Sequence, residues 1–377
     1  MNIEDRIGNF LEERKQNKLY RSLKLTEDLV DFSSNDYLGL ARSAFIRQQV
    51  DLEYQQYKHQ KTGATGSRLL NGNSSLYEEI EEQIAQIHHA EAALIFNSGF
   101  DANVGLLSTV ARKDDIIFYD ESIHASLHQG IKLSGAESKS FAHQNYADLE
   151  AKLSLCSPEK VKFIVSESVF SMKGDKADLK ILAHFAQKYK ANLIVDEAHA
   201  TGIFGEKGSG LCRELEMENA CFARIYTFGK AIGSHGAAVV GSRQLKDYLI
   251  NFSKNFIYTT ALSTPNLLSV KHSYFFIQNN VNQLNRLFNL INFFKSEINS
   301  LNIDYKILGE GPVFCLLVSG NENCRDFAAY FQANGLDLRP ILSPTVPKGQ
   351  ELIRIVLHSY NTELELNKLF SLIVDYK

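Results

Sequence analysis

The sequence predicts an α/β protein with a mainly parallel central sheet, helices on both faces of that sheet, and a smaller α/β domain at the C-terminus. Three observations lead to this prediction. Short apolar runs alternate with helical stretches, and crossover connections between parallel strands produce that alternation. The 377 residues exceed the usual length of one domain, so a second domain is expected. Hydrophobic residues make up 44% and charged residues 22%, as in ordinary soluble globular proteins.

The first of three expected segments covers residues 1–45. A helix is expected from Ile3 to Tyr20, and a short strand running into a turn is expected from VDFSSNDYLGL at 30–40. The next helix is expected from Ser75 to His89, because its apolar residues recur on one helical face.

The large domain is expected to cover residues 46–265 and to hold six apolar runs that form strands. They are ALIF (93–96), DIIFY (115–119), KFIVSES (162–168), NLIVDEA (192–198), RIYTF (224–228) and AAVVG (237–241). Helices between them, such as one from Leu179 to Lys190, supply the crossovers that parallel strands require. Residues 266–377 are expected to form a linking helix from about Asn266 to Asn299, continuous or broken, and the small C-terminal domain.

Charge and hydropathy exclude several classes of function. The chain has 44 acidic and 40 basic residues, so it lacks the basic surplus expected for nucleic-acid binding. No apolar stretch approaches the roughly 18–20 residues that span a bilayer. The charged N-terminus does not resemble a signal peptide. The five cysteines are an odd number and widely scattered, which favours free thiols in the cytoplasm.

Polar residues gather at the expected carboxyl ends of the strands, where open α/β sheets bind their ligands. Five segments provide them: NSGFDAN, ESIHAS, ESVFSMKGD, DEAHATG and TFGKAIGSHG. Each segment alone is weak evidence, because strand ends are commonly polar. Five of them at one edge of a sheet indicate a ligand site.

Three other interpretations of these segments fail. LIVDEAH resembles the DEAH box of helicases, but the only Gly-Lys pair, Gly229-Lys230, is followed by alanine, so the required phosphate loop is missing. A Rossmann site is not indicated, because the glycines of GEKGSG (205–210) stand in the wrong order. His124 and His128 have a zinc-compatible spacing, but no third ligand is evident and no metal is expected.

Pyridoxal phosphate (PLP) fits all five segments. Its chemistry needs a lysine for a Schiff base, a carboxylate at the pyridinium nitrogen and donors for the phosphate. Asp196 ends a buried strand, where a protonated ring nitrogen would pair a carboxylate that is otherwise costly to bury. His199 would reach the ring's phenolic oxygen, and Lys230 would point into the crevice. Gly99 and Phe100 open a helix whose free N–H groups suit a phosphate.

The chain resembles the α-oxoamine synthases, PLP enzymes of fold type I, from Asp31 to His358. The motifs that carry the resemblance keep their order: FSSNDYLGL, GATGSRLLNG, NSGFDAN, DESIHAS, FAHQN, ESVFSMKGD, VDEAHATG, TFGKAIGSHGAA, FIYTTA and SPTVP. FAHQN followed by SPTVP is most similar to the members that serve biotin biosynthesis. Aminolevulinate synthase, 2-amino-3-ketobutyrate CoA ligase and serine palmitoyltransferase share most of the others.

The resemblance implies a role for each matching residue. Lys230 would carry the cofactor and act as acid and base, and His124 would stack on its ring. Asp196 and His199 complete the expected catalytic set. The other expected cofactor contacts are Gly99, Phe100, Ser171 and Thr227, with Thr259 or Thr260 reaching in from a neighbouring subunit. The expected substrate contacts are Asn35 and Arg354 at the amino-acid carboxylate, and Arg21 and Thr345 at the acyl group.

The implied reaction is a decarboxylative condensation of L-alanine with a pimeloyl thioester, on CoA or a carrier protein, in a homodimer. Two alternatives stay open: a sister enzyme that uses glycine or serine, and a non-catalytic binding module. Leu342 stands where some members have arginine, and Arg68 stands where some have histidine. The resemblance therefore specifies the acyl substrate less firmly than the cofactor. Instead of binding a substrate, Arg354 could be a residue on the outer face of a strand. Arg21 could be a solvated charge on a helix.

Overall fold

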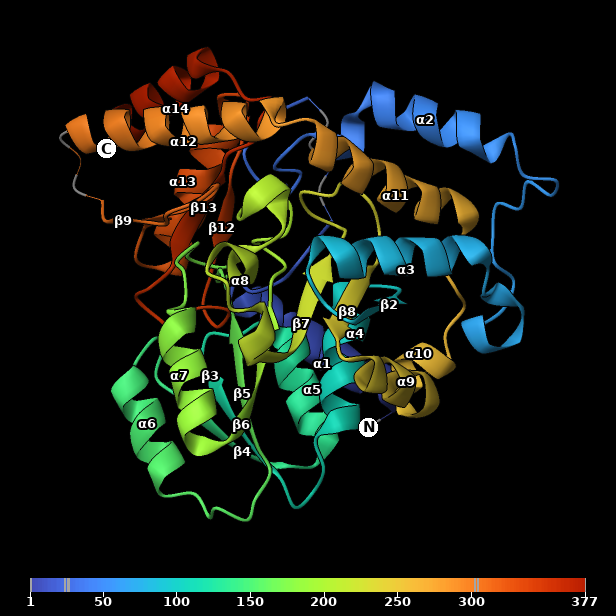
Figure 1. Cartoon of the computed structure of the whole chain (residues 1–377). Coiled ribbons are helices and arrows are strands. Elements are labelled where there is room, and N and C mark those ends of the chain that lie inside the picture. Colours follow the sequence, from blue (N-terminus) through green and yellow to red (C-terminus); the bar gives the residue numbers. More distant parts are fainter. Residues whose placement is uncertain (1, 24, 26–27, 302, 304, 377) are drawn as a thin grey trace.

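The computed structural model describes residues 2–23, 25, 28–301, 303 and 305–376, and a seven-stranded sheet lies at its centre (Figure 1). In spatial order the strands are β2 (Ala92–Phe96), β8 (Ala237–Gly241), β7 (Cys221–Thr227), β6 (Ala191–Asp196), β5 (Lys162–Glu167), β3 (Ile116–Asp120) and β4 (Glu137–Phe141). Strand β8 is antiparallel to its neighbours β2 and β7, and the other neighbouring pairs are parallel. The expected mainly parallel sheet is confirmed.

Strand β4 is the one member of this sheet that the sequence does not predict. It lies at the edge of the sheet, and four of its five residues, ESKS, are exposed while Phe141 is buried. An edge strand has only one strand neighbour and needs no continuous apolar run. Hydropathy therefore gives no signal for it.

Helices cover the central sheet, and β2 and β5 are buried at every position, which requires cover on both faces. The helices of this part are α2 (Ala44–Tyr54), α3 (Ser75–Ile87), α4 (Gly99–Val110), α5 (Ala125–Ser134), α6 (Tyr146–Ser154), α7 (Leu179–Tyr189), α8 (Leu211–Glu214), α9 (Arg243–Phe252) and α10 (Lys254–Ile257). Short helical turns form at Leu40–Arg42 (η1), Arg68–Gly72 (η2), Glu206–Gly208 (η3) and Glu218–Ala220 (η4).

The expected linking helix is two helices, α11 (Thr264–Asn279) and α12 (Asn282–Ser300). They lead to a four-stranded antiparallel sheet in the order β12 (Arg339–Ile341), β13 (Leu352–Val356), β10 (Val313–Leu317) and β9 (Ile307–Leu308). Helix α13 (Asn321–Ala333) packs on this sheet, and α14 (Glu363–Asp375) packs on α12. The smaller C-terminal α/β unit is therefore present.

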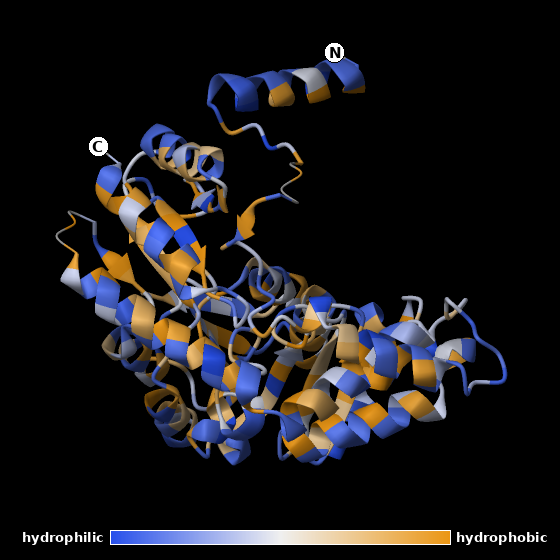
Figure 2. Ribbon diagram, turned by 90° about the horizontal axis from the view of Figure 1, so that it is seen from above, coloured by the Kyte–Doolittle hydropathy of each residue, from blue (hydrophilic) through white to orange (hydrophobic). Residues whose placement is uncertain are grey.

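The first segment of the chain joins this small unit. Strand β1 (Val30–Asp31) pairs in parallel with β11 (Leu336–Asp337). Helix α1 (Ile3–Gln16) is shorter than the helix expected to end at Tyr20, has no buried residue, and stands away from the body (Figure 2). Its apolar side chains thus have no partner within the described part of the chain.

Among the helices that the structure describes, none combines the length and the apolar character that crossing a bilayer would require.

Candidate active site

A cavity of about 320 Å³ opens at the carboxyl ends of β5, β6 and β7 and at the start of α4. This volume lies in the range of small-molecule sites. Many of the predicted site residues line it: Asn35, Gly99, Phe100, His124, Asp196, His199, Thr227 and Lys230. Neighbouring parallel strands end at the same edge of a sheet, so residues far apart in the sequence meet there. The structure thus brings most of the predicted site together.

The carboxylate of Asp196 is buried and fixed on both oxygens. Asn103 donates from Nδ2 to its Oδ2 at 2.7 Å, and the N–H of Ala198 donates to its Oδ1 at 2.9 Å. These donors stabilise the ionised form, as the role at a protonated ring nitrogen requires. Asn103, on α4, was not predicted as a site residue.

His199 is held by a residue that the sequence analysis did not single out. The hydroxyl of the buried Tyr37 lies 2.6 Å from Nδ1 of His199. Burial, together with the charges of Lys230 and Arg354, holds the pKa of His199 well below its usual value, so the ring is neutral. With Nδ1 engaged, Nε2 is the nitrogen left for the cavity.

Lys230 comes shortly after the end of β7, directly after the exposed Gly229. Burial lowers the pKa of Lys230, and the negative charge of Asp196 opposes that effect. A lowered pKa increases the fraction of free amine, which is the form that forms a covalent bond to a carbonyl or removes a proton.

The start of α4 supplies the expected phosphate site. A Cβ added at Gly99 would lie 2.7 Å from Cγ2 of Thr227, so this close approach requires glycine. Oγ1 of Thr227 is buried without a hydrogen-bond partner among the described residues. The carboxylate of Asp101 is bound by Ser98 and Asn255, so it does not compete for an anion at the helix start.

His124 caps α5, and its Nδ1 accepts from the N–H of Ser126 at 3.2 Å and lies 2.7 Å from the Ser126 hydroxyl. Burial lowers its pKa, and the charge of Asp196 opposes this. His128 packs edge-on against Tyr119 at 5.3 Å instead of facing the cavity. The two histidines therefore have separate environments.

Arg354 reaches the rim of the cavity from β13 of the small unit. It donates from Nη2 to Oδ1 of Asn35 at 2.8 Å and from Nε to the carbonyl of Ser171 at 3.2 Å. Asn35 lines the cavity, whereas Ser171 lies behind the wall. The outer-face interpretation of Arg354 is therefore wrong, and a guanidinium with five donors still has capacity for a carboxylate.

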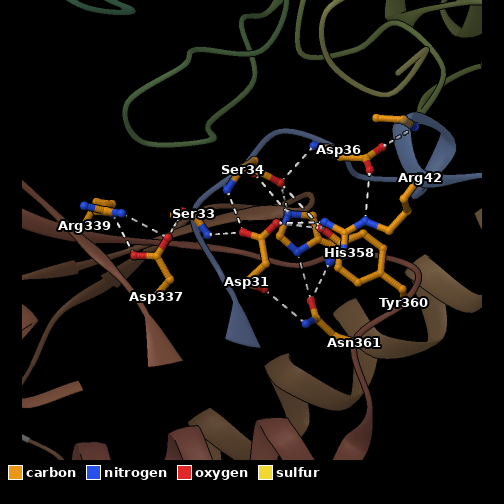
Figure 3. Close-up of polar contacts among 11 residues, drawn as sticks. Asp31, Ser33, Ser34, Asp36, Arg42, Asp337, Arg339, His358, Tyr360 and Asn361 are labelled. Carbon is orange, nitrogen blue, oxygen red and sulfur yellow. Dashed lines mark hydrogen bonds and ion pairs between the residues drawn. The ribbon is translucent and has the colours of Figure 1, made fainter. Parts of the chain in front are cut away.

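A hydrogen-bonded network fixes the segment that carries Asn35 (Figure 3). We call it the N-terminal clamp; it consists of Asp31, Ser34, Arg42, His358, Tyr360 and Asn361. Asp31 accepts from the N–H of Ser34 at 2.9 Å and from the hydroxyl of Tyr360 at 2.8 Å. His358 contacts both the carbonyl of Ser34 and the side chain of Asn361 at 3.0 Å. The clamp holds Asn35 next to the small unit.

Besides Ser171 and Arg354, four predicted residues are not among those that line the cavity. Asn97 donates to Oγ1 of Thr259 and to the carbonyl of Thr260, away from the lining residues. Arg21 and Thr345 line a separate groove of about 220 Å³, between the end of α1 and the segment after β12. A single chain thus does not bring these residues to the cofactor site.

Glu167 is the cavity residue that sequence reasoning missed most clearly. It ends β5, and its Cα lies opposite that of Asp196 in the neighbouring strand. The strand-end argument that selected Asp196 applies to it equally. Other missed lining residues are Ser98, Asn103, Ser126, Ala198, His235 and Gly236.

The residues of the cavity fit PLP. A buried carboxyl group that accepts hydrogen bonds on both oxygens, a neutral histidine and a lysine with a lowered pKa meet there, and the helix start beside Thr227 Oγ1 suits its phosphate. Thr227, with a buried hydroxyl that has no partner in the described chain, gives independent evidence for a ligand.

Comparisons with known proteins identify the family of the chain. The model of the aminotransferase class I and II family matches residues 27–371. The 8-amino-7-oxononanoate synthase of Emericella nidulans is 39% identical, covering 96% of this chain and 93% of its own. The enzyme of the same name from Lysinibacillus sphaericus is 35% identical, covering 90% and 86%.

Solved structures show the same fold. The 8-amino-7-oxononanoate synthase of Francisella tularensis is 28% identical with a TM-score of 0.78, covering 92% of this chain and 97% of its own. The serine palmitoyltransferase of Sphingomonas wittichii has a TM-score of 0.91 over 99% and 98% of the chains, but at 22% identity it supports the fold alone. The chain therefore belongs to the aminotransferase class I and II family of PLP-dependent enzymes and, within it, to the α-oxoamine synthases.

Proposed function

We propose that this protein is an 8-amino-7-oxononanoate synthase, which condenses L-alanine with pimeloyl-CoA or a pimeloyl-carrier protein and releases the thiol and CO₂. The observation that carries the chemistry is the convergence of Lys230, Asp196 and His199 on one cavity, with Arg354 hydrogen-bonded to the lining residue Asn35. The substrate assignment rests on the relatives of that name, which match the chain over nearly its full length.

PLP, when bound, supplies an electron sink for a carbanion at the α-carbon of an amino acid. Asp196 would hold the proton of the ring nitrogen, and Lys230 Nζ would remove the proton from Cα. A new bond then joins Cα to the thioester carbonyl carbon as the C–S bond breaks. The carboxylate that leaves as CO₂ would be held by Arg354 and Asn35 until the condensation is complete. The thiolate takes a proton from solvent, and the electron pair left at Cα by the loss of CO₂ takes up the proton that Lys230 removed.

Purified protein with PLP would be supplied with alanine, glycine or serine, each with acyl-CoAs of several lengths and with a pimeloyl-carrier protein. We expect alanine and a pimeloyl thioester to give the highest kcat/KM, with a product mass equal to both substrates minus the thiol and CO₂. A higher kcat/KM for glycine or serine with every donor would instead assign a sister reaction. No turnover with any pair, despite bound PLP, would favour a binding module.

A homodimer is part of this proposal. Several large apolar side chains are exposed; among them are Leu70 at 84%, Tyr258 at 81% and, on α1, Phe10 at 62%. Thr259 and Thr260 follow Tyr258 and lie outside their own chain's cavity. A second copy covering this surface would bury the apolar groups and bring these threonines to the partner's phosphate site. Sedimentation should show a dimer, and a fully active monomer would contradict it.

A cytoplasmic location is also proposed, because five widely scattered cysteines are typical of proteins that keep free thiols in a reducing compartment.

A further inference from the structure

The cavity contains a second carboxyl group that the proposed reaction does not use. Glu167 ends β5 beside Asp196 on β6, and the two residues are register partners in neighbouring parallel strands. Only 2% of Glu167 is exposed, and it lines the cavity. Two carboxyl groups thus emerge side by side at the floor of one ligand site.

The two carboxyl groups differ in how they are bound. Both oxygens of Asp196 accept hydrogen bonds, from Asn103 and Ala198. Oε2 of Glu167 accepts from the N–H of Ser171 at 3.3 Å, but its Oε1 is buried without a hydrogen-bond partner among the described residues. Leaving a buried polar atom unsatisfied is costly, so such an atom next to a cavity indicates a partner supplied by the ligand.

The charges around Glu167 determine whether its carboxyl group is protonated. Burial raises the pKa of Glu167 to about 8, and the negative charge of Asp196 adds to this. Lys230, after β7, the hydrogen bond from the N–H of Ser171 and the nearby N–H of His124 oppose the rise without cancelling it. Burial and the neighbouring charge of Asp196 therefore favour the protonated form of the Glu167 carboxyl at neutral pH.

We propose that Glu167 is a catalytic-site carboxylic acid that donates its Oε1 proton in a hydrogen bond to an acceptor oxygen of the ligand held between Asp196 and Lys230. The inference rests on the proposed use of this cavity for PLP and its substrate. It assigns Ser171 a positioning role, in which its N–H fixes Oε2 and leaves the protonated oxygen toward the cavity. The resemblance had placed Ser171 itself at the ring.

Infrared difference spectroscopy on the whole protein tests the protonation state without any turnover. Cofactor-free wild type is compared with Glu167→Gln from about pH 6 to about pH 10. We expect a carboxylic-acid carbonyl band that disappears with a midpoint near pH 8 in wild type and is absent from the variant. Glu197 is also buried with a raised pKa, so the band is assigned by its loss in Glu167→Gln. A Glu167 carboxyl already ionised at pH 6 overturns the proposal.

Adding PLP tests the contact. We expect the assigned band to shift, because its proton becomes hydrogen-bonded, and an unshifted band would overturn the contact. Glu167→Gln, which keeps a donor, should hold PLP within about threefold of wild type, whereas Glu167→Met should weaken binding about three- to tenfold. Equal affinities in both variants would contradict the donor role. Visible absorbance measures PLP binding without substrate, so a failure of the alanine assignment leaves these results interpretable.

Discussion

The cavity and the N-terminal clamp are both polar and both join distant parts of the chain, but they differ in how completely their polar atoms are paired. In the cavity, Asn103 Oδ1, Glu167 Oε1 and Thr227 Oγ1 are buried without hydrogen-bond partners among the described residues. The buried side-chain polar atoms of the clamp all have partners there. Unpaired buried atoms are typical of a ligand site, whereas fully paired ones are typical of a structural network. Substitutions in the two regions should therefore affect different properties.

The largest expected effect belongs to Lys230→Ala in the cavity. The variant loses the group that we propose holds the cofactor covalently and moves the Cα proton, so kcat should fall at least about a thousand-fold. Folding should survive, because a side chain that faces a cavity contributes little to the core. Turnover and thermal melting measured together check this. Substantial residual activity would show that another group carries the chemistry.

Arg354→Lys should have the next largest effect. A lysine keeps the charge but cannot reproduce the planar two-point contact with a carboxylate. We expect the KM for alanine to rise about tenfold or more, since a hydrogen bond to a charged group contributes about 1.5–3 kcal/mol. The KM for the acyl thioester should change far less. Equal changes in both values would place Arg354 outside the amino-acid site.

The contrast between the regions also explains what the sequence could predict. Asp196, His199 and Lys230 follow buried apolar strands, and the edge of a parallel sheet brings strand ends together whatever the details of packing. Glu167 also ends a buried strand, so the same argument predicts it as a site residue, although the resemblance assigns a role in its segment only to Ser171. Position at a strand end is thus a good guide to the site.

Strand ends do not predict the residues of the clamp or the other contacts made by the first segment of the chain. Pairing of β1 with β11 joins residues about 300 positions apart in the sequence, and no local pattern specifies that partner. Tyr37 has no strand end to indicate a role, and its bond to His199 depends on where the first segment packs. Arg21 and Thr345 were placed by resemblance, and their groove shares no residue with the cavity.

A matched pair of tyrosine substitutions compares the two regions directly. Tyr37→Phe removes the hydroxyl that fixes His199 and Asn35, and should lower kcat/KM by up to about tenfold, since one hydrogen bond contributes about 0.5–1.5 kcal/mol. Burial already raises the pKa of Tyr37 to about 12, so the loss should not depend on pH near neutrality. Tyr360→Phe removes a clamp hydroxyl and should lower the melting temperature with a smaller change in kcat/KM. A larger loss of kcat/KM in Tyr360→Phe than in Tyr37→Phe would contradict the distinction between site and clamp.

The smallest effect on activity is expected from Asp31→Asn, which tests the clamp through pH. Burial alone would raise the pKa of Asp31, but His358 and the hydrogen bonds of Ser34 and Ser33 outweigh it and hold this pKa below the ordinary 3.8. A group with a lowered folded-state pKa contributes stability above its unfolded pKa and loses it as the pH falls through the folded value. The variant should therefore be about 1–3 kcal/mol less stable than wild type at pH 5 to 7. That difference should shrink below about pH 4, because the Asp31 carboxylate of the unfolded chain then takes up a proton while that of the folded protein is still ionised. Urea unfolding at pH 7, 5 and 3 measures it, and a difference that is unchanged at pH 3 would mean that the shape of Asp31, and not its charge, stabilises the clamp.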